Sequence, residues 1–169
     1  FCILVRKNAL TKVYINELKK LGINAKGEEE RSYFSSREVS VLLDVMRIID
    51  NPLNDIAITA VLMSPMFMFS AEEMALLRSY NKDNHFYINI EEISNNENNS
   101  EISPIFIKKC IAIYGFIKSF RLLAITLSTE ELIKKIYDTT DFVTVMQLYT
   151  DGDKKQANLR QLINYAKSY

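Results

Sequence analysis

Several residue types are scarce in this chain of 169 residues: it has no tryptophan, three prolines, four glycines, two cysteines and one histidine. None of the glycines lies in a G-x-x-x-x-G-K-[ST] or G-x-G-x-x-G pattern, so the two common phosphate-binding loops are absent. His85 has no cysteine or second histidine near it in sequence, which favours a surface histidine over a metal ligand. We therefore expect no catalytic, cofactor-binding or metal-binding residue in this stretch of sequence.

The remaining absences concern cysteine pairing, net charge and membrane segments. Cys2 and Cys110 are far apart and form no CxxC motif, as is typical of reduced cytosolic thiols. The 21 basic and 21 acidic residues cancel, so bulk charge predicts neither a nucleic acid nor a membrane partner. The most apolar segment, residues 105–127, is interrupted by four cations and is a poor membrane span. We expect a soluble cytoplasmic protein with no membrane partner.

The N-terminal stretch predicts a strand, a turn and a helix. Ile3, Leu4 and Val5 form an apolar run typical of a strand buried on both faces, and apolar residues then recur at helical spacing up to the stop signal Gly22. A strand of this kind needs neighbours that nothing later in the sequence supplies. We therefore expect a piece cut from a larger α/β domain, and the absence of an initiator Met agrees.

The rest of the chain predicts a mostly α fold. The sequence has three candidate capping boxes, each a serine followed three residues later by glutamate: Ser35 with Glu38, Ser70 with Glu73 and Ser128 with Glu131. Asn54 is a plausible cap for another helix, and the helix after Ser36 is apolar on two faces, which places it at the centre of the core. The polar segment 94–100 is predicted to be a loop.

Basic residues are the main candidates for ligand binding. Segment 104–127 has four cations and no acid, and after Asp153 come Lys154, Lys155, Arg160 and Lys167 without an acid. If the two basic helices adjoin, they form a stripe that follows a phosphate backbone; otherwise they are ordinary solvated faces. Arg6 and Asn8 follow the predicted strand, at the edge where open α/β sheets bind ligands, although a simple polar turn is the alternative.

At this point the residues match a known family. The segments ILVRKN, LKKLGI, YFSSREVSVLLDVMRIIDNPLNDIAITAVLMSP, FSAEEMALLRS and DGDKKQANLRQLINYA resemble the C-terminal motor half of UvrD/Rep-like superfamily 1 DNA helicases. Within that family, the resemblance is closest to the larger-motor component, AddA, of bacterial AddAB helicase/nuclease complexes. It covers most of the chain and is weakest over residues 80–104.

The resemblance implies a division of the chain and a role for it. Residues 1–31 would be a piece of the second RecA-like motor domain (2A), and residues 32–169 a helical 2B-like insertion. The parent would be an ATP-dependent DNA helicase and exonuclease of double-strand break repair and recombination. ATP, Mg²⁺ and the catalytic motifs would belong to the parent, outside this fragment. Its partners would be single-stranded and duplex DNA and the other subunit of a helicase/nuclease heterodimer.

The same resemblance implies DNA contacts and one departure from the family pattern. Arg6 and Asn8 match an Arg-x-Asn motif associated with the single-strand track, and the candidate phosphate contacts are Lys154, Lys155 and Arg160. Related helicases carry a Gly-Ile-Gly turn whose N–H groups approach duplex phosphates, but here the turn is Met66–Phe69, without glycine. We therefore expect a non-catalytic DNA-positioning region, or alternatively a helical module that docks on a partner subunit or its own motor domains.

Overall fold

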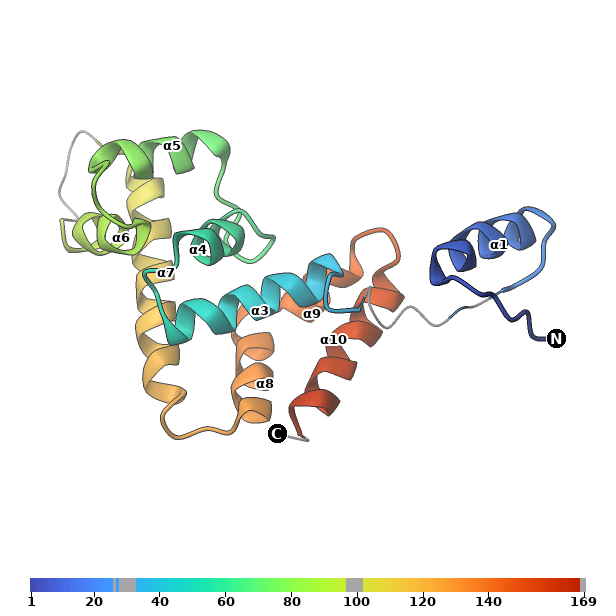
Figure 1. The fold of residues 1–169 in the computed structure, drawn as a ribbon. Coiled ribbons are helices and arrows are strands. Elements are labelled where there is room, and N and C mark those ends of the chain that lie inside the picture. The colour runs from blue at the N-terminus through green and yellow to red at the C-terminus, as the bar shows by residue number, and fades with distance from the viewer. Residues whose placement is uncertain (26, 28–32, 97–101, 168–169) are drawn as a thin grey trace. The chain divides into compact units, whose positions relative to one another are not determined.

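The computed structural model describes residues 1–25, 27, 33–96 and 102–167, and it divides the chain into two compact units, Phe1–Ser35 and Ser36–Tyr169 (Figure 1). Each unit is described separately. Every regular element of the described residues is an α-helix, which confirms the predicted mostly α fold. None of these helices combines the length and apolar composition needed to traverse a lipid bilayer.

The first unit contains helix α1, Asn8–Lys20. Gly22 ends it in the left-handed conformation at φ 74°, with Gly22 N–H donating to Lys19 O and Ile23 N–H donating to Leu18 O. These two bonds form a Schellman motif, so the predicted glycine stop is confirmed. A side chain at Gly22 would be strained by its φ alone.

The strand predicted over Ile3–Val5 is not formed. Residues 1–5 have no regular secondary structure, and the side chains of Ile3 and Leu4 are exposed rather than buried on both faces. A strand is stable only when a neighbouring strand pairs with its N–H and C=O groups, and the described residues contain no other strand. The β-α piece of a RecA-like domain is thus represented here by its helix alone.

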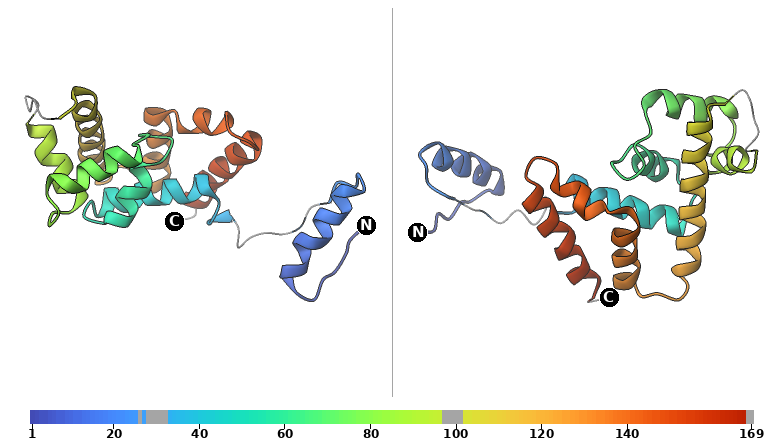
Figure 2. Two further views of the ribbon diagram at one scale, coloured as in Figure 1. Left: turned by 90° about the horizontal axis from the view of Figure 1, so that it is seen from above. Right: turned by 180° about the vertical axis from the view of Figure 1, so that it is seen from behind.

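The second unit is built around helix α3, Arg37–Asp50. Figures 1 and 2 show two groups of helices on either side of it. The first group contains α4 (Asp55–Leu62), α5 (Ala71–Tyr80), α6 (Phe86–Asn95) and α7 (Pro104–Leu123). The second group contains α8 (Thr129–Thr140), α9 (Phe142–Gln147) and α10 (Gly152–Ala166). Helix α3 packs against α4, α7 and α10 and thereby joins the two groups.

The central position of α3 follows from its sequence. Its apolar residues on two faces are buried, as predicted: Val39, Val41, Leu42, Val45, Ile48 and Ile49. Leu43 and Met46 are half-buried on the remaining side. Because apolar side chains surround most of this helix, it is stable only when neighbours cover it on several sides.

Two of the three predicted capping boxes are present. Ser70 caps α5 and Ser128 caps α8, each with its glutamate bonded back to the serine. Asn54 caps α4 by accepting from Ala57 N–H at 3.2 Å. The box predicted for Ser35 and Glu38 is wrong, because Ser36 occupies the N-cap of α3. Glu38 is buried instead, and its Oε1 accepts a hydrogen bond from Asn158 of α10 at 2.6 Å.

The loop predicted over residues 94–100 begins later than expected. Ser94 and Asn95 form the end of α6, where Ser94 is buried and its hydroxyl donates to Ile90 O. Residues 97–100 lie outside the described part of the chain. A serine that donates to the carbonyl four residues earlier satisfies its own polar group, which makes burial inside a helix tolerable.

The two thiols lie in different settings, with Cys2 exposed and Cys110 fully buried, and both are free. Burial raises the pKa of the Cys110 thiol to about 12, and the charge of Glu73 raises it further in the same direction. The thiolate is the reactive form of cysteine, so Cys110 acts as a small apolar core residue.

Candidate nucleic-acid interface

The structure places Arg6 and Asn8 at the start of α1. Arg6 is exposed in a bend, Lys7 is the N-cap with extended backbone, and Asn8 is the first residue of the helix. The two positions therefore lie next to one another at one end of a helix rather than at the end of a paired strand. Their role in DNA binding stays a prediction.

Helix α10 carries Lys154, Lys155 and Arg160 on three different sides. With about 100° of rotation per residue, each pair among them is separated by roughly 100° to 140° around the helix axis. Lys155 is half-buried, with its ammonium 5.2 Å from the centroid of the Tyr149 ring, whereas Lys154 and Arg160 are exposed. Counting cations along the sequence missed this separation, since closeness in sequence does not place side chains on one helix face.

The continuous basic stripe considered from the sequence is not formed. Figures 1 and 2 place α8 between α7 and α10. Several cations of α7 also contact the protein itself. Lys109 lies 2.8 Å from Glu73 and donates to Met68 O at 3.0 Å, and Arg121 donates to the main-chain oxygens of Ile49 and Asp50. These cations hold α7 against its neighbours, so their sequence pattern reflects packing.

The turn Met66–Phe69 uses its own backbone N–H groups. Met66 N–H donates to the Ser64 hydroxyl, Phe67 and Met68 N–H both donate to Ser64 O, and Phe69 N–H donates to Leu62 O. At the start of α5, Ser70 N–H donates to Glu73, and two glutamates occupy the first turn. Neither the turn nor this helix end offers a phosphate the free N–H groups and positive field that anion binding requires.

The two phenylalanines of this turn are packed, as the sequence indicated for its large apolar side chains. The Phe67 ring lies 5.4 Å from that of Phe116, and the Phe69 ring lies 6.0 Å from that of Phe106, both edge to face. Met68 is different: it is 70% exposed and adopts φ 53°, a left-handed conformation that favours glycine.

Replacing Met68 by glycine is expected to stabilise the protein by about 0.5–1 kcal/mol, because glycine adopts this φ without a Cβ clash and little buried surface is lost. Urea unfolding followed by circular dichroism measures the change. Met68→Ala is the matched control, since alanine keeps the clash and also shortens the side chain. Equal stability of the glycine and alanine variants would contradict the strain argument.

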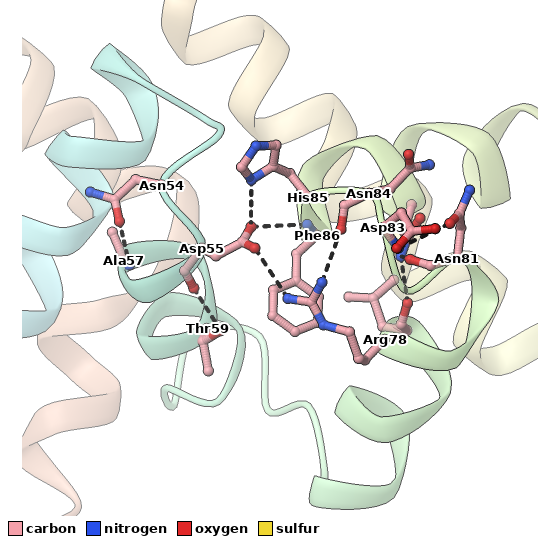
Figure 3. Close-up of polar contacts among 12 residues, drawn as sticks. Asn54, Asp55, Ala57, Thr59, Arg78, Asn81, Asp83, Asn84, His85 and Phe86 are labelled. Atoms are coloured by element: carbon pink, nitrogen blue, oxygen red, sulfur yellow. Dashed lines mark hydrogen bonds and ion pairs between the residues drawn. The ribbon is translucent and has the colours of Figure 1, made fainter.

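A second polar site, centred on Asp55, joins α4 to α5 and α6 (Figure 3). One carboxylate oxygen, Oδ1, accepts from Phe86 N–H at 3.0 Å and lies 3.5 Å from His85 Nδ1. The other, Oδ2, lies 3.1 Å from Arg78 Nη2. Sequence reasoning missed this cluster because its members are distant along the chain, and the only signal was an aspartate at the first position of a helix.

Arg78 completes the Asp55 cluster from α5. Its Nη1 donates to Asn84 O at 2.9 Å, and its guanidinium lies 3.9 Å from the centroid of the Phe86 ring. One arginine thus contacts a carboxylate, a main-chain carbonyl and an aromatic face at the start of α6. This arrangement positions helices, and within the described part of the chain no three metal-ligating side chains come together.

The cap of α5 makes stability depend on pH. Burial alone would raise the pKa of the Glu73 carboxyl, but hydrogen bonds from Lys109 and from Ser70 N–H outweigh it and hold this pKa below 4.5. Hydrogen bonds from the Ser128 hydroxyl and N–H likewise lower the pKa of Glu131. A carboxyl whose pKa is lower in the folded state stabilises the protein above its unfolded pKa, and that contribution is lost as the pH falls through the folded value.

We therefore expect the free energy of unfolding to decrease as the pH is lowered from about 4.5, the range in which carboxyls of depressed pKa become protonated. Urea unfolding at a series of pH values measures this slope. The double variant Glu73→Gln, Glu131→Gln should be less stable at neutral pH and should have a shallower slope. A slope equal to that of the unmodified chain would show that other carboxyls cause the acid sensitivity.

Comparison with known proteins agrees with the motifs. The model of the UvrD-like helicase C-terminal domain matches residues 1–169. An ATP-dependent helicase/nuclease of the AddA type from Clostridium perfringens (strain 13 / Type A) is 33% identical over 156 residues, covering 92% of this chain and 12% of the relative. Its counterpart in Bacillus pumilus (strain SAFR-032) is 32% identical over 167 residues, covering 99% and 13%.

A third relative, the corresponding ATP-dependent helicase/nuclease of Bacillus cereus (strain B4264), is 32% identical over 169 residues, covering 100% of this chain and 14% of the relative. The chain thus spans a small part of the length of the relatives that it matches. The resemblance drawn from the sequence motifs is confirmed. Because the family model covers every residue, this chain belongs to the family of UvrD-like helicase C-terminal domains.

Proposed function

We propose that this chain is the non-catalytic DNA-positioning region of an ATP-dependent DNA helicase/nuclease that acts in double-strand break processing and recombination. The observation that carries the proposal is the family match over the whole chain, together with relatives that are named as ATP-dependent helicase/nucleases. Residues 1–31 then belong to the motor domain 2A and residues 32–169 to the helical insertion 2B. ATP and Mg²⁺ act in the parent, outside this chain.

In this proposal the two groups of candidate residues contact different DNA. Arg6 and Asn8, adjacent at the start of α1, contact the single strand along which the motor moves. Lys154 and Arg160 contact phosphates, and their exposure supports this assignment. Lys155 contributes less, because it is half-buried beside Tyr149. Phosphate contacts of this kind hold DNA in place and carry no sequence information.

The test uses the full-length helicase/nuclease that we propose contains this chain. Arg6→Ala and Asn8→Ala should each slow translocation on single-stranded DNA and raise the number of ATP molecules hydrolysed per nucleotide travelled. Lys19→Ala is the matched control, because Lys19 is an exposed cation near the other end of α1. Stopped-flow translocation and ATPase assays give both quantities. Wild-type rates for the Arg6 and Asn8 variants would refute the assignment to the single-strand track.

The isolated chain allows a separate test of α10. It should bind a fluorescent DNA duplex weakly, since the net charge is zero and it holds only part of the DNA path. The double variant Lys154→Ala, Arg160→Ala should reduce the slope of log affinity against log salt by about 2, one unit for each lost phosphate contact. The control is Lys108→Ala, Lys135→Ala, which removes two exposed cations from α7 and α8. An equal change in the control would assign the binding to non-specific charge.

The second candidate function is a helical module that docks on a partner subunit or on the motor domains of the same protein. The turn Met66–Phe69 favours it, because its N–H groups are bonded internally while Met68 is exposed. An apolar side chain held outward on a turn is better suited to contact protein than phosphate. If the α10 and α1 variants behave as wild type, this function becomes the better account.

A further inference from the structure

We propose that the groove between α3, α7 and α8 binds an amphipathic helix of a partner protein, with an acidic residue of that helix facing Lys118. The groove has a volume of about 650 Å³. Its lining residues are Met46, Ile49, Asp50, Tyr87, Lys118, Arg121, Leu122, Ala124, Ile125, Leu127, Thr129 and Leu132. The inference goes beyond the proposed DNA-positioning role and does not depend on it.

The wall formed by the end of α7 is apolar and open to solvent. Leu122 is 66% exposed and Ile125 is 79% exposed, and Ala124 beside them is also exposed. These side chains continue into the half-buried Leu127 at the start of the connection to α8. Single exposed apolar residues are ordinary, but a contiguous apolar set that borders a groove is characteristic of a protein interface.

The groove is rigid on both sides, so a partner would find it already formed. After α7 ends, Ile125 N–H donates to Leu122 O, and Thr126 and Leu127 N–H both donate to Leu123 O. The Ser128 capping box then starts α8 directly. On the other side, Arg121 bonds to the last two carbonyls of α3. A preformed site binds with a smaller loss of conformational entropy than a flexible one.

The charges of the groove determine the chemistry of the partner. Two cations, Lys118 and Arg121, line it against one carboxylate, Asp50. The guanidinium of Arg121 is engaged at the end of α3, whereas Lys118 is exposed and lies over the face of Tyr114, 5.3 Å from the ring centroid. Within the described part of the chain Lys118 forms no ion pair, so it is the cation available to a carboxylate of the partner.

A helix suits this site better than DNA does. An amphipathic helix presents apolar side chains at positions i, i+3, i+4 and i+7, which fill an apolar groove, while an acidic residue beside them reaches a cation at the rim. A DNA strand would place successive phosphates over apolar side chains and near Asp50 and Glu91, the latter bonded to the Tyr114 hydroxyl at 2.6 Å. Those phosphates would gain little from Lys118 alone.

The experiment uses a fluorescein-labelled amphipathic peptide with leucine at i, i+3, i+4 and i+7 and glutamate beside them, and a second peptide with lysine in place of each glutamate. Fluorescence anisotropy with the whole chain measures both affinities. We expect the glutamate peptide to bind about tenfold more tightly than the lysine peptide, and Lys118→Glu to reverse this order. Ile125→Ser should weaken both peptides, because it removes apolar surface from the groove wall.

Two matched variants locate the binding. Lys154→Glu reverses an exposed charge on α10, and Ile56→Ser replaces an apolar residue that is 86% exposed on α4. Neither should change either affinity by more than about twofold. The proposal is overturned if neither peptide binds saturably, if the two peptides bind equally, or if a matched variant weakens binding as much as its counterpart in the groove. Thermal melts confirm that every variant compared is folded.

Discussion

Replacing Leu42 by alanine is expected to lower the free energy of unfolding of the helical unit by about 2–5 kcal/mol. Leu42 is fully buried in α3, the helix that packs against α4, α7 and α10. Truncation there removes apolar contacts and leaves a cavity between helices that several neighbours hold in place. Because those neighbours constrain one another, the cavity cannot close by a small movement, and the loss should lie toward the upper end of this range. Urea unfolding at neutral pH measures it.

Two control variants distinguish burial from helix propensity. Leu43→Ala lies one residue further along the same helix but is half-buried, so its cost should be less than half that of Leu42→Ala. Ile56→Ala, at a side chain 86% exposed, should change stability by no more than about 0.5 kcal/mol. Similar losses for Leu42 and Leu43 would show that α3 is not oriented in the core as described.

The second large effect is expected at Asp55. Asp55→Ala should lower the free energy of unfolding by about 1–3 kcal/mol, because it leaves Phe86 N–H and Arg78 without their acceptor where both are partly buried. The side chains of Arg78 and Asp55 are 38% and 31% exposed, so water replaces part of the lost interaction and larger values are not expected. Chemical unfolding measures the change.

Further substitutions separate the contributions around Asp55. Asp55→Asn keeps an acceptor for Phe86 N–H but removes the negative charge, so its stability should fall between those of the wild type and Asp55→Ala. Asp83→Ala removes an exposed carboxylate from the turn next to the cluster and should change stability by no more than about 0.5 kcal/mol. An equal loss for Asp83→Ala would mean that overall charge, rather than the bonds of Asp55, explains the effect.

The predictions that succeeded from sequence concern interactions between residues a few positions apart. The caps by Asn54, Ser70 and Ser128 and the glycine stop at Gly22 all involve atoms within one turn of the backbone, so residue type and spacing determine them. The family assignment succeeded for a related reason, because motifs such as the Asn51-Pro52 turn and the segment around it are contiguous in sequence. The DNA contacts proposed at the start of α1 and on α10 remain predictions.

The predictions that failed needed knowledge of distant residues. A strand over Ile3–Val5 depends on partner strands, and the described residues contain none. The capping box at Glu38 was displaced because Asn158, far along the chain, offers that carboxylate a buried hydrogen bond. The basic stripe failed because α8 lies between α7 and α10, and Lys109 and Arg121 pair with groups on other helices.

By itself, the sequence determined that this protein is mostly helical, where several of its helices begin and end, which helix lies at the centre, and which family it belongs to. Only the tertiary structure decided which cations are free and which hold helices together, that the Met66–Phe69 turn uses its own N–H groups, and where a groove lies. The reason is physical: helix formation and capping act over one turn, whereas the partners of a charged side chain depend on how helices pack.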